Sequence, residues 1–197
     1  MWLGPFLLLS NDVMKYYNEH YKEYIDSTFS LSLEEEYSFL TPYLKENASI
    51  LDVGFGSARD MLYFQKHGYR VFGIDVVEGF IDHARELGLN VEYGDLNTYM
   101  PKEKVDCIFL SAVLLHLQRE KIIPTIDRFL NFLNDNGILF LSMKYSEKED
   151  GFDEKDRYYT YFHKEDLDSF PFKVKEYRIS QDSQRKDTQW IFFILQK

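Results

Sequence analysis

The sequence has only one cysteine among its 197 residues, so it can form no internal disulfide bond. Such scarcity is typical of a reducing compartment, and we predict a cytoplasmic protein. Cys107 stands in the apolar run VDCIFL, which favours a buried structural thiol over a reactive one. The sequence also lacks internal repeats, low-complexity segments and Pro/Gly/Ser-rich linkers, so we expect a single domain over residues 1–197.

The sequence has no apolar run long enough to cross a membrane, and we predict no membrane association. The N-terminal stretch MWLGPFLLLS is apolar, but it is short, has no basic first region and is followed by no small-residue cleavage pattern. The stretch MKYYNEHYKEY, from Met14, reads as a more natural protein start. We therefore expect residues 1–13 to be a dispensable extension.

Basic residues are in the minority, with 23 Lys and Arg against 33 Asp and Glu, and the formal net charge is −10. An acidic surface repels phosphate backbones, which disfavours a nucleic-acid partner. The five histidines are scattered, and no paired cysteines or HExxH motif accompany them, so we predict no metal site. A G-x-S-x-G nucleophile turn is also absent.

What the sequence does contain is an alternation of strand-like and helix-like segments. The apolar runs of strand length are 48–53, 70–75, 90–95, 105–111, 137–143, 172–179 and 190–196. Helical patterns occupy 14–27, 33–45, 57–67, 78–87 and 118–133. The alternation predicts a mostly parallel sheet with helices on both faces. The last two strands have no helix between them and should pair antiparallel. Pro124 should bend its helix or lie in the first turn.

The stretch ILDVGFGSARD joins the first apolar run to a helix. Gly54 and Gly56 remove Cβ atoms where a ligand could approach the backbone, and the following helix offers free N–H groups. This arrangement predicts a nucleotide-type crevice at the carboxyl end of a strand. Arg59 occupies the position of the third glycine of a dinucleotide fingerprint, which argues against NAD or FAD. No Gly-Lys-Ser/Thr is present to form a kinase-type phosphate loop.

The run DVGFGSA, beginning at Asp52, resembles motif I (D-x-G-x-G-x-G/A) of the class I S-adenosylmethionine (SAM)-dependent methyltransferases. The resemblance implies a Rossmann-like sandwich with a seven-stranded, mostly parallel sheet and a C-terminal antiparallel hairpin. It implies SAM as cofactor and S-adenosylhomocysteine (SAH) as product. Asp52 would lie below the aminoacid moiety, and Gly54 and Gly56 beside the cofactor. Phe55 replaces a small residue and is expected to narrow the pocket near the methyl group.

Further positions match the family after the next three strands. Asp75, followed by Val76, would accept hydrogen bonds from the ribose hydroxyls; a helix N-cap or strand-end carboxylate is the alternative. The resemblance places Asp95 beside the adenine amine and the backbone of Leu96 against the ring; capping of the following turn is the alternative. Ser111 belongs to the motif IV region, where substrate and methyl group meet.

The resemblance covers roughly residues 48–145. Beyond them, SAVLLHL and RYYTYF resemble a narrower group of small bacterial-type methyltransferases of undefined acceptor. We therefore predict an enzyme that transfers a methyl group to a small-molecule acceptor by in-line displacement. The alternatives are an RNA or protein methyltransferase and a SAM-binding protein without catalysis.

Three side chains near the expected cofactor site have open roles. His116 follows the motif IV strand and suits a general base, or packs over the cofactor instead. Arg59 would contact the cofactor, or pair with its neighbour Asp60. Tyr17 belongs to the aromatic N-terminal helices of residues 14–45, which in this family often form a lid over SAM; packing in the core is the alternative.

The charged segment 144–162 follows the fifth strand and could overhang the pocket as an acceptor lid. Arg157 and Arg185 would bind an anionic acceptor, because a guanidinium matches a carboxylate or phosphate. Surface salt bridges are the alternative for both. Tyr161, at the Tyr-rich end of the segment, is a candidate for acceptor contact.

Overall fold

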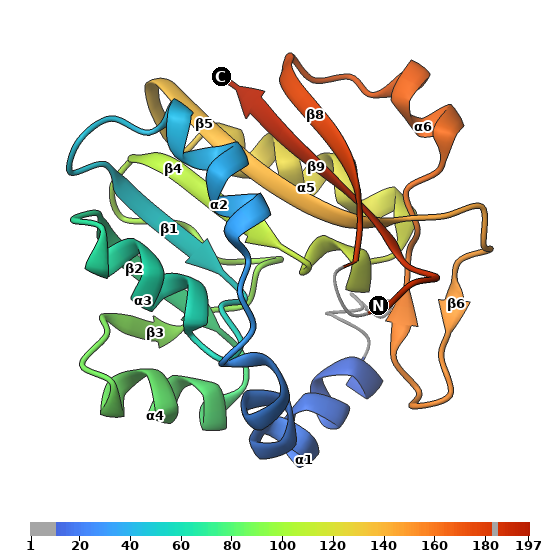
Figure 1. The fold of residues 1–197 in the computed structure, drawn as a ribbon, viewed down its shortest axis with the longest axis horizontal. Coiled ribbons are helices and arrows are strands. Elements are labelled where there is room, and N and C mark those ends of the chain that lie inside the picture. Colours follow the sequence, from blue (N-terminus) through green and yellow to red (C-terminus); the bar gives the residue numbers. More distant parts are fainter. Residues whose placement is uncertain (1–10, 183–184) are drawn as a thin grey trace, which may run out of the picture.

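The computed structural model describes residues 11–182 and 185–197. A seven-stranded sheet with the order β3-β2-β1-β4-β5-β9-β8 runs through the molecule, with helices against both faces (Figure 1). Its strands are β1 (Ser49–Val53), β2 (Arg70–Asp75), β3 (Val91–Tyr93), β4 (Val105–Ser111), β5 (Leu133–Tyr145), β8 (Val174–Gln181) and β9 (Gln189–Gln196). A small separate sheet pairs β6 (Gly151–Phe152) with β7 (Tyr158–Tyr159).

The direction of the strands confirms the predicted fold. Strands β1 to β5 pair parallel, whereas β9 pairs antiparallel with both β5 and β8. The final hairpin therefore returns its second strand to the centre and leaves β8 at the edge. Strand β5 begins four residues earlier than expected: Leu133 pairs with Val105 before a register shift, and the intervening NDNG carries Asn136 at a φ of +63°.

The helices follow the predicted segments. They are α1 (Asn11–Thr28), α2 (Glu34–Leu40), α3 (Arg59–Lys66), α4 (Glu78–Glu86), α5 (Arg119–Leu130) and α6 (Lys164–Ser169), with short 3-10 turns η1 (Thr41–Tyr43) and η2 (Leu114–His116). Pro124 lies inside α5 beyond its first turn, so the expectation of a first-turn proline is wrong. The second N-terminal helix stops at Leu40, where a turn containing proline takes over.

The central strands are buried on both faces because alternate side chains enter two different cores. On one face, Leu110 and Phe193 pack with buried residues of α5. On the other, Phe109 and Phe140 stack at 4.7 Å between ring centroids and pack with α2 and α3. Cys107 belongs to this second core, where burial raises the pKa of its thiol, as expected of a structural cysteine.

Helix α1 lies beyond the carboxyl ends of the parallel strands and packs against α4 (Figure 1). It has non-helical backbone angles at His20. Most of the predicted dispensable extension lies outside the described residues, but α1 already begins at Asn11 and Val13 is buried. In the described parts of the chain, no helix combines the length and apolarity needed to cross a membrane.

Candidate active site

The turn after β1 needs glycine for both backbone conformation and space. Gly54 and Gly56 have φ angles of +71° and +54°. A Cβ at Gly54 would lie 2.6 Å from Cγ2 of Val113, and one at Gly56 would lie 3.0 Å from Cε1 of Tyr24. The turn is therefore packed closely between the motif IV region and α1.

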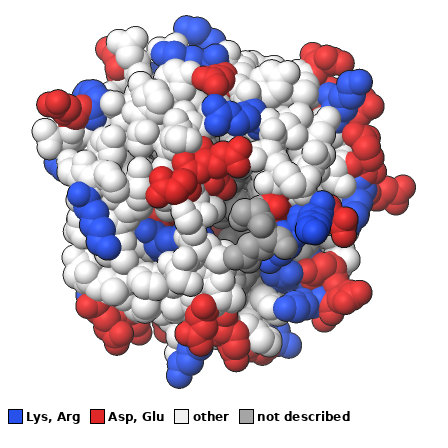
Figure 2. All heavy atoms as spheres, in the orientation of Figure 1, with Lys and Arg blue, Asp and Glu red and all other residues white. Residues whose placement is uncertain are grey.

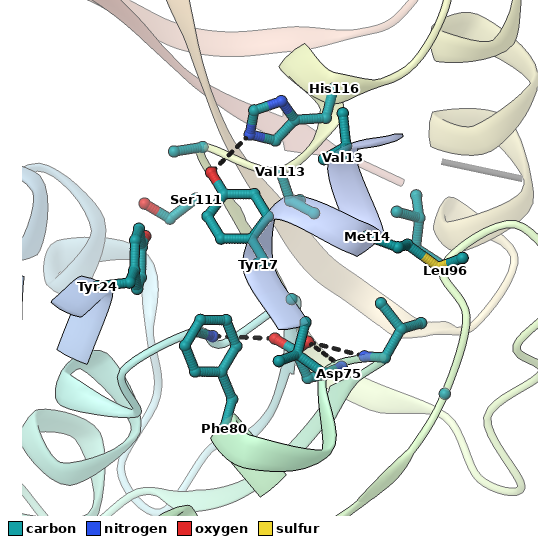
Figure 3. Close-up of a pocket in the computed structure, with 16 residues that line it drawn as sticks. Val13, Met14, Tyr17, Tyr24, Asp75, Phe80, Leu96, Ser111, Val113 and His116 are labelled. Carbon is teal, nitrogen blue, oxygen red and sulfur yellow. Dashed lines mark hydrogen bonds between the residues drawn. The ribbon is translucent and has the colours of Figure 1, made fainter. Parts of the chain in front are cut away.

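Asp75 at the end of β2 holds this turn in place. Its Oδ2 accepts a hydrogen bond from the backbone N–H of Gly56 at 3.0 Å, and its Oδ1 accepts from Val76 at 2.7 Å and Val77 at 2.9 Å (Figure 3). Burial raises the pKa of Asp75 to about 6, against the opposing effect of these three donors. The carboxylate is thus charged at neutral pH and fixed in direction.

Asp52 is a second buried carboxylate beside the same turn. Its Oδ2 has no hydrogen-bond partner among the described residues. Burial, together with the nearby carboxylates of Asp60 and Asp75, holds the pKa of Asp52 well above its usual range. A buried acid of this kind is stabilised by a cation, so the site suits a positively charged ligand.

A cavity of about 80 Å³ opens between the glycine turn, the ends of β2 and β4, and α1. We call it the inner cavity. Figure 3 shows Tyr17 and Tyr24 of α1 facing Phe80 and Asp75 across it. Seven of the residues predicted to bind the cofactor line it: Tyr17, Gly54, Gly56, Asp75, Val76, Leu96 and Ser111.

Phe55 has a different place from the one expected. Its ring is buried in the core with Met61, and a Cβ on Gly73 would lie 2.8 Å from its Cδ1. Phe55 is not among the described residues that line either cavity of the site. The expectation that it narrows the pocket near the methyl group is therefore wrong, because the turn directs its side chain behind β2.

Asp95 and Arg59 also lie outside the inner cavity, as far as the described residues show. Oδ1 of Asp95 accepts from the backbone and side-chain nitrogens of Asn97, both at 2.8 Å, which is the turn-capping alternative. Arg59 forms two 3.0 Å hydrogen bonds to Asp60, the pairing alternative, and donates to the carbonyl of Thr28. This pair ties α3 to the end of α1.

His116 forms a buried link between α1 and the β7 strand. Its Nδ1 lies 2.8 Å from the carbonyl oxygen of Tyr158, which can only accept, so Nδ1 carries the proton. Nε2 then accepts from the hydroxyl of Tyr17 at 3.1 Å (Figure 3). Burial lowers the pKa of His116 to about 4 and raises that of Tyr17. The imidazole is therefore neutral at physiological pH and held in one tautomer.

A second cavity, of about 390 Å³, adjoins the first, and we call it the outer cavity. The residues that line both cavities are Tyr17, Tyr24, Ser111, Ala112 and His116. A ligand in one cavity and a ligand in the other would therefore meet at this shared wall.

Charged side chains of both signs line the outer cavity. They include Glu34, Glu35 and Glu36 at the start of α2, and Lys144 and Arg185. In Figure 2, acidic side chains gather over the start of α2, and basic side chains lie to their right, beyond the grey atoms.

The predicted acceptor residues separate in the structure. Arg157 lines the outer cavity, but its Nη2 lies 2.6 Å from Oδ2 of Asp153, which is the salt-bridge alternative. Tyr161 lines a different pocket, beside Arg119 and α6, so its role as an acceptor contact stays a prediction. Sequence reasoning missed Lys144. Its place at the carboxyl end of the fifth predicted strand was the signal for it, because ligands of parallel sheets bind at that edge.

Residues 50–137 match the family model described as "Methyltransferase domain". The chain carries a methyltransferase domain. This domain contains the glycine turn, Asp75 and His116, so the matched region holds most of the inner cavity. A comparison with curated proteins found no match.

Solved structures share the fold of this methyltransferase domain and of the strands after it. The 1,6-didemethyltoxoflavin-N1-methyltransferase of Burkholderia thailandensis, with bound 1,6-didemethyltoxoflavin and SAH, is 18% identical with a TM-score of 0.79, and the match covers 94% of this chain and 87% of that one. The N-methyltransferase NodS of Bradyrhizobium japonicum WM9, in complex with SAH, is 14% identical with a TM-score of 0.65, covering 90% and 98%. The [4+2]-cyclase SpnF is 15% identical with a TM-score of 0.68, covering 94% of each chain. The fold thus serves more than one reaction.

Proposed function

We propose that the protein is a SAM-dependent methyltransferase that acts on a small-molecule acceptor. SAM occupies the inner cavity, and the acceptor occupies the outer cavity. The observation that carries this proposal is the wall that both cavities share, formed by Tyr17, Ser111 and His116 among others. A methyl donor and its acceptor must meet at one such boundary for in-line transfer.

The residues around the inner cavity suit SAM in particular. SAM carries a cationic amine and a sulfonium and has no pyrophosphate, so the buried carboxyl of Asp52, whose Oδ2 has no hydrogen-bond partner among the described residues, fits it better than a dinucleotide. Asp75 is oriented to accept from ribose hydroxyls. Leu96 offers an apolar surface for the adenine. SAH is bound in the Burkholderia and Bradyrhizobium neighbours, which supports the same cofactor here.

When bound, SAM supplies an activated methyl group. The chain's own residues then need to align the acceptor and exclude water, and such alignment lowers reaction barriers by roughly 7–11 kcal/mol. Tyr17, donating to a neutral His116, sits at the wall where the acceptor's attacking atom would lie. His116 can take a proton through this hydroxyl only from a strongly acidified group, because its own pKa is about 4.

A small-molecule acceptor is supported by the size of the outer cavity. Its volume of about 390 Å³ lies within the range of roughly 300–1,000 Å³ typical of small-ligand sites. Tyr159 and Trp190 give it aromatic walls. The Burkholderia neighbour binds a heterocyclic acceptor, 1,6-didemethyltoxoflavin. The glutamates of α2 disfavour an RNA backbone at the same opening.

Calorimetric titration with SAM, SAH and NAD tests the cofactor assignment. Wild-type protein should bind SAM and SAH at micromolar concentrations and should not bind NAD. Asp75→Asn should weaken SAM binding at least about tenfold, because it loses the carboxylate that faces the ribose. Asp82→Asn, on the exposed surface of α4, is the matched control and should bind like wild type. Binding of NAD, or of no nucleotide by well-folded protein, would contradict the proposal.

A further inference from the structure

Lys144 stands out among the cations of the outer cavity because its charge is not matched. Arg59 is paired with Asp60 and Arg157 with Asp153. Lys144 is half-buried, and no carboxylate lies within salt-bridge distance of its Nζ among the described residues. Its Nζ lies 3.7 Å from the ring centroid of Tyr159.

The charged groups that act most strongly on Lys144 are mostly of its own sign. Burial, with Arg185 and Arg157 nearby, lowers the pKa of Lys144 to about 8. The charged and titratable groups that face it or share its cavity are Lys148, Asp153, Arg157, Tyr159, Arg185, Asp182 and the glutamates of α2. A half-buried ammonium among other cations is unfavourable in the unliganded protein. A ligand anion beside Lys144 would offset this unfavourable electrostatic free energy.

We propose that the acceptor is a small aromatic carboxylate whose negative group pairs with Lys144 and Arg185. This inference rests on the proposed function and names the substrate class of the outer cavity. The aromatic part would pack against the ring-lined wall that includes Trp190. Glu34, Glu35 and Glu36 line the same cavity and would repel the carboxylate, which favours an orientation with the carboxylate beside Lys144 and Arg185.

Two cations of the outer cavity are available to bind a ligand carboxylate. Arg157 is committed to Asp153, which leaves Lys144 and Arg185 for the ligand. Lys144 at the end of β5 lies near Arg185 of the β8–β9 connection, so the carboxylate would bind at one end of the acceptor. The other end of the acceptor is left to face the shared wall at Ser111 and His116, where methyl transfer would occur.

A matched pair of probes tests this inference without the natural acceptor. Binding of 4-methoxybenzoate and of its neutral isostere 4-methoxybenzamide, neither of which carries an ionisable phenol, is measured by ligand-observed NMR, with the protein saturated with SAH. Wild type should bind the carboxylate at least about tenfold more tightly than the amide. Lys144→Met should remove most of this preference. Lys148→Met, an exposed lysine on the same segment, is the control and should retain it.

Dependence on pH provides a second readout. Lys144 is charged below about pH 8. Carboxylate affinity should therefore fall as the pH rises through that value, by up to the roughly tenfold preference that Lys144 is expected to provide. Burial raises the pKa of Glu36 to about 7. As the pH rises, Glu36 becomes negatively charged, and its repulsion also lowers the affinity for the carboxylate. Amide affinity should not change, and Lys144→Met should abolish the fall above pH 8.

The outcomes separate the two proposals. Equal affinity of wild type for the two probes, or a carboxylate preference that survives Lys144→Met, overturns the anionic subsite. If SAH binds in such an experiment, the proposed function stands without the subsite. In the reverse case, the protein fails to bind SAH and still shows a carboxylate preference that depends on Lys144. That result would uphold the anionic subsite and overturn the cofactor assignment.

Discussion

Asp75 shows how a single residue can serve ligand binding at the expense of stability. Its pKa rises from 3.8 to about 6 on folding, so keeping it ionised at neutral pH costs about 3 kcal/mol. The folded state binds more protons than the unfolded state between these values. The contribution of Asp75 to the free energy of unfolding therefore falls as the pH rises between these two pKa values. The carboxylate is retained because, in our account, it faces the cofactor.

Asp52→Asn should separate stability from cofactor binding. The substitution replaces a buried carboxyl group whose pKa burial holds well above its usual range and whose Oδ2 has no hydrogen-bond partner among the described residues. We expect a higher melting temperature for the unliganded variant at pH 8, by roughly 2–4 °C per kcal/mol gained for a chain of this size. We also expect weaker SAM binding, because the amine loses its counter-charge.

Thermal unfolding with and without SAM measures both effects, and Asp26→Asn on the exposed side of α1 is the control. A variant that is less stable than wild type, yet binds SAM equally well, would show that Asp52 has a structural role only.

At the scale of elements, α1 is positioned by a close contact with α4. Gly79 lies in α4, and a Cβ there would lie 2.4 Å from the Cδ2 of Tyr21 in α1. This contact sets how near α1 comes to the inner cavity, which Tyr17 and Tyr24 of the same helix help to line. The glycine therefore helps to set the position of α1 beside the inner cavity.

Gly79→Ala should weaken SAM binding by about tenfold while leaving overall stability within about 1 kcal/mol of wild type. Alanine is the better helix former by about 1 kcal/mol, which offsets part of the lost packing. The reason for weaker binding is that α1 must move away from the cavity. Calorimetry and urea unfolding measure the two quantities.

Gly151→Ala is the control, because a Cβ at that position would have no atom within 4 Å. Unchanged SAM affinity in Gly79→Ala would rule out α1 as part of the cofactor site.

The apolar runs, and the glycines that end the helices between them, made the seven main strands predictable from the sequence. The start of β5 was not, because NDNG reads as a turn although Leu133 already pairs with Val105. The β6 and β7 strands have two residues each, too few for any periodic pattern. The direction of Phe55 depends on positive φ angles at its neighbours Gly54 and Gly56, which residue type permits but does not specify.

At the scale of the whole molecule, the site combines segments that are far apart in the sequence. The cofactor side was largely predictable, because its glycine turn and Asp75 belong to a compact motif in residues 50–137. The acceptor side was not, because Lys144 and Arg185 become neighbours only through the insertion of β9 beside β5. Arg157 resembled an anion ligand in sequence, whereas Asp153 four residues earlier pairs with it.

The most direct test of the account is a crystal structure of the protein with SAH. We expect SAH in the inner cavity, with its ribose hydroxyls in hydrogen-bonding contact with Asp75, its amine near Asp52 and the glycine turn, and the outer cavity left free for an acceptor. SAH bound in the outer cavity, or elsewhere without contact to Asp75, would contradict the central claim.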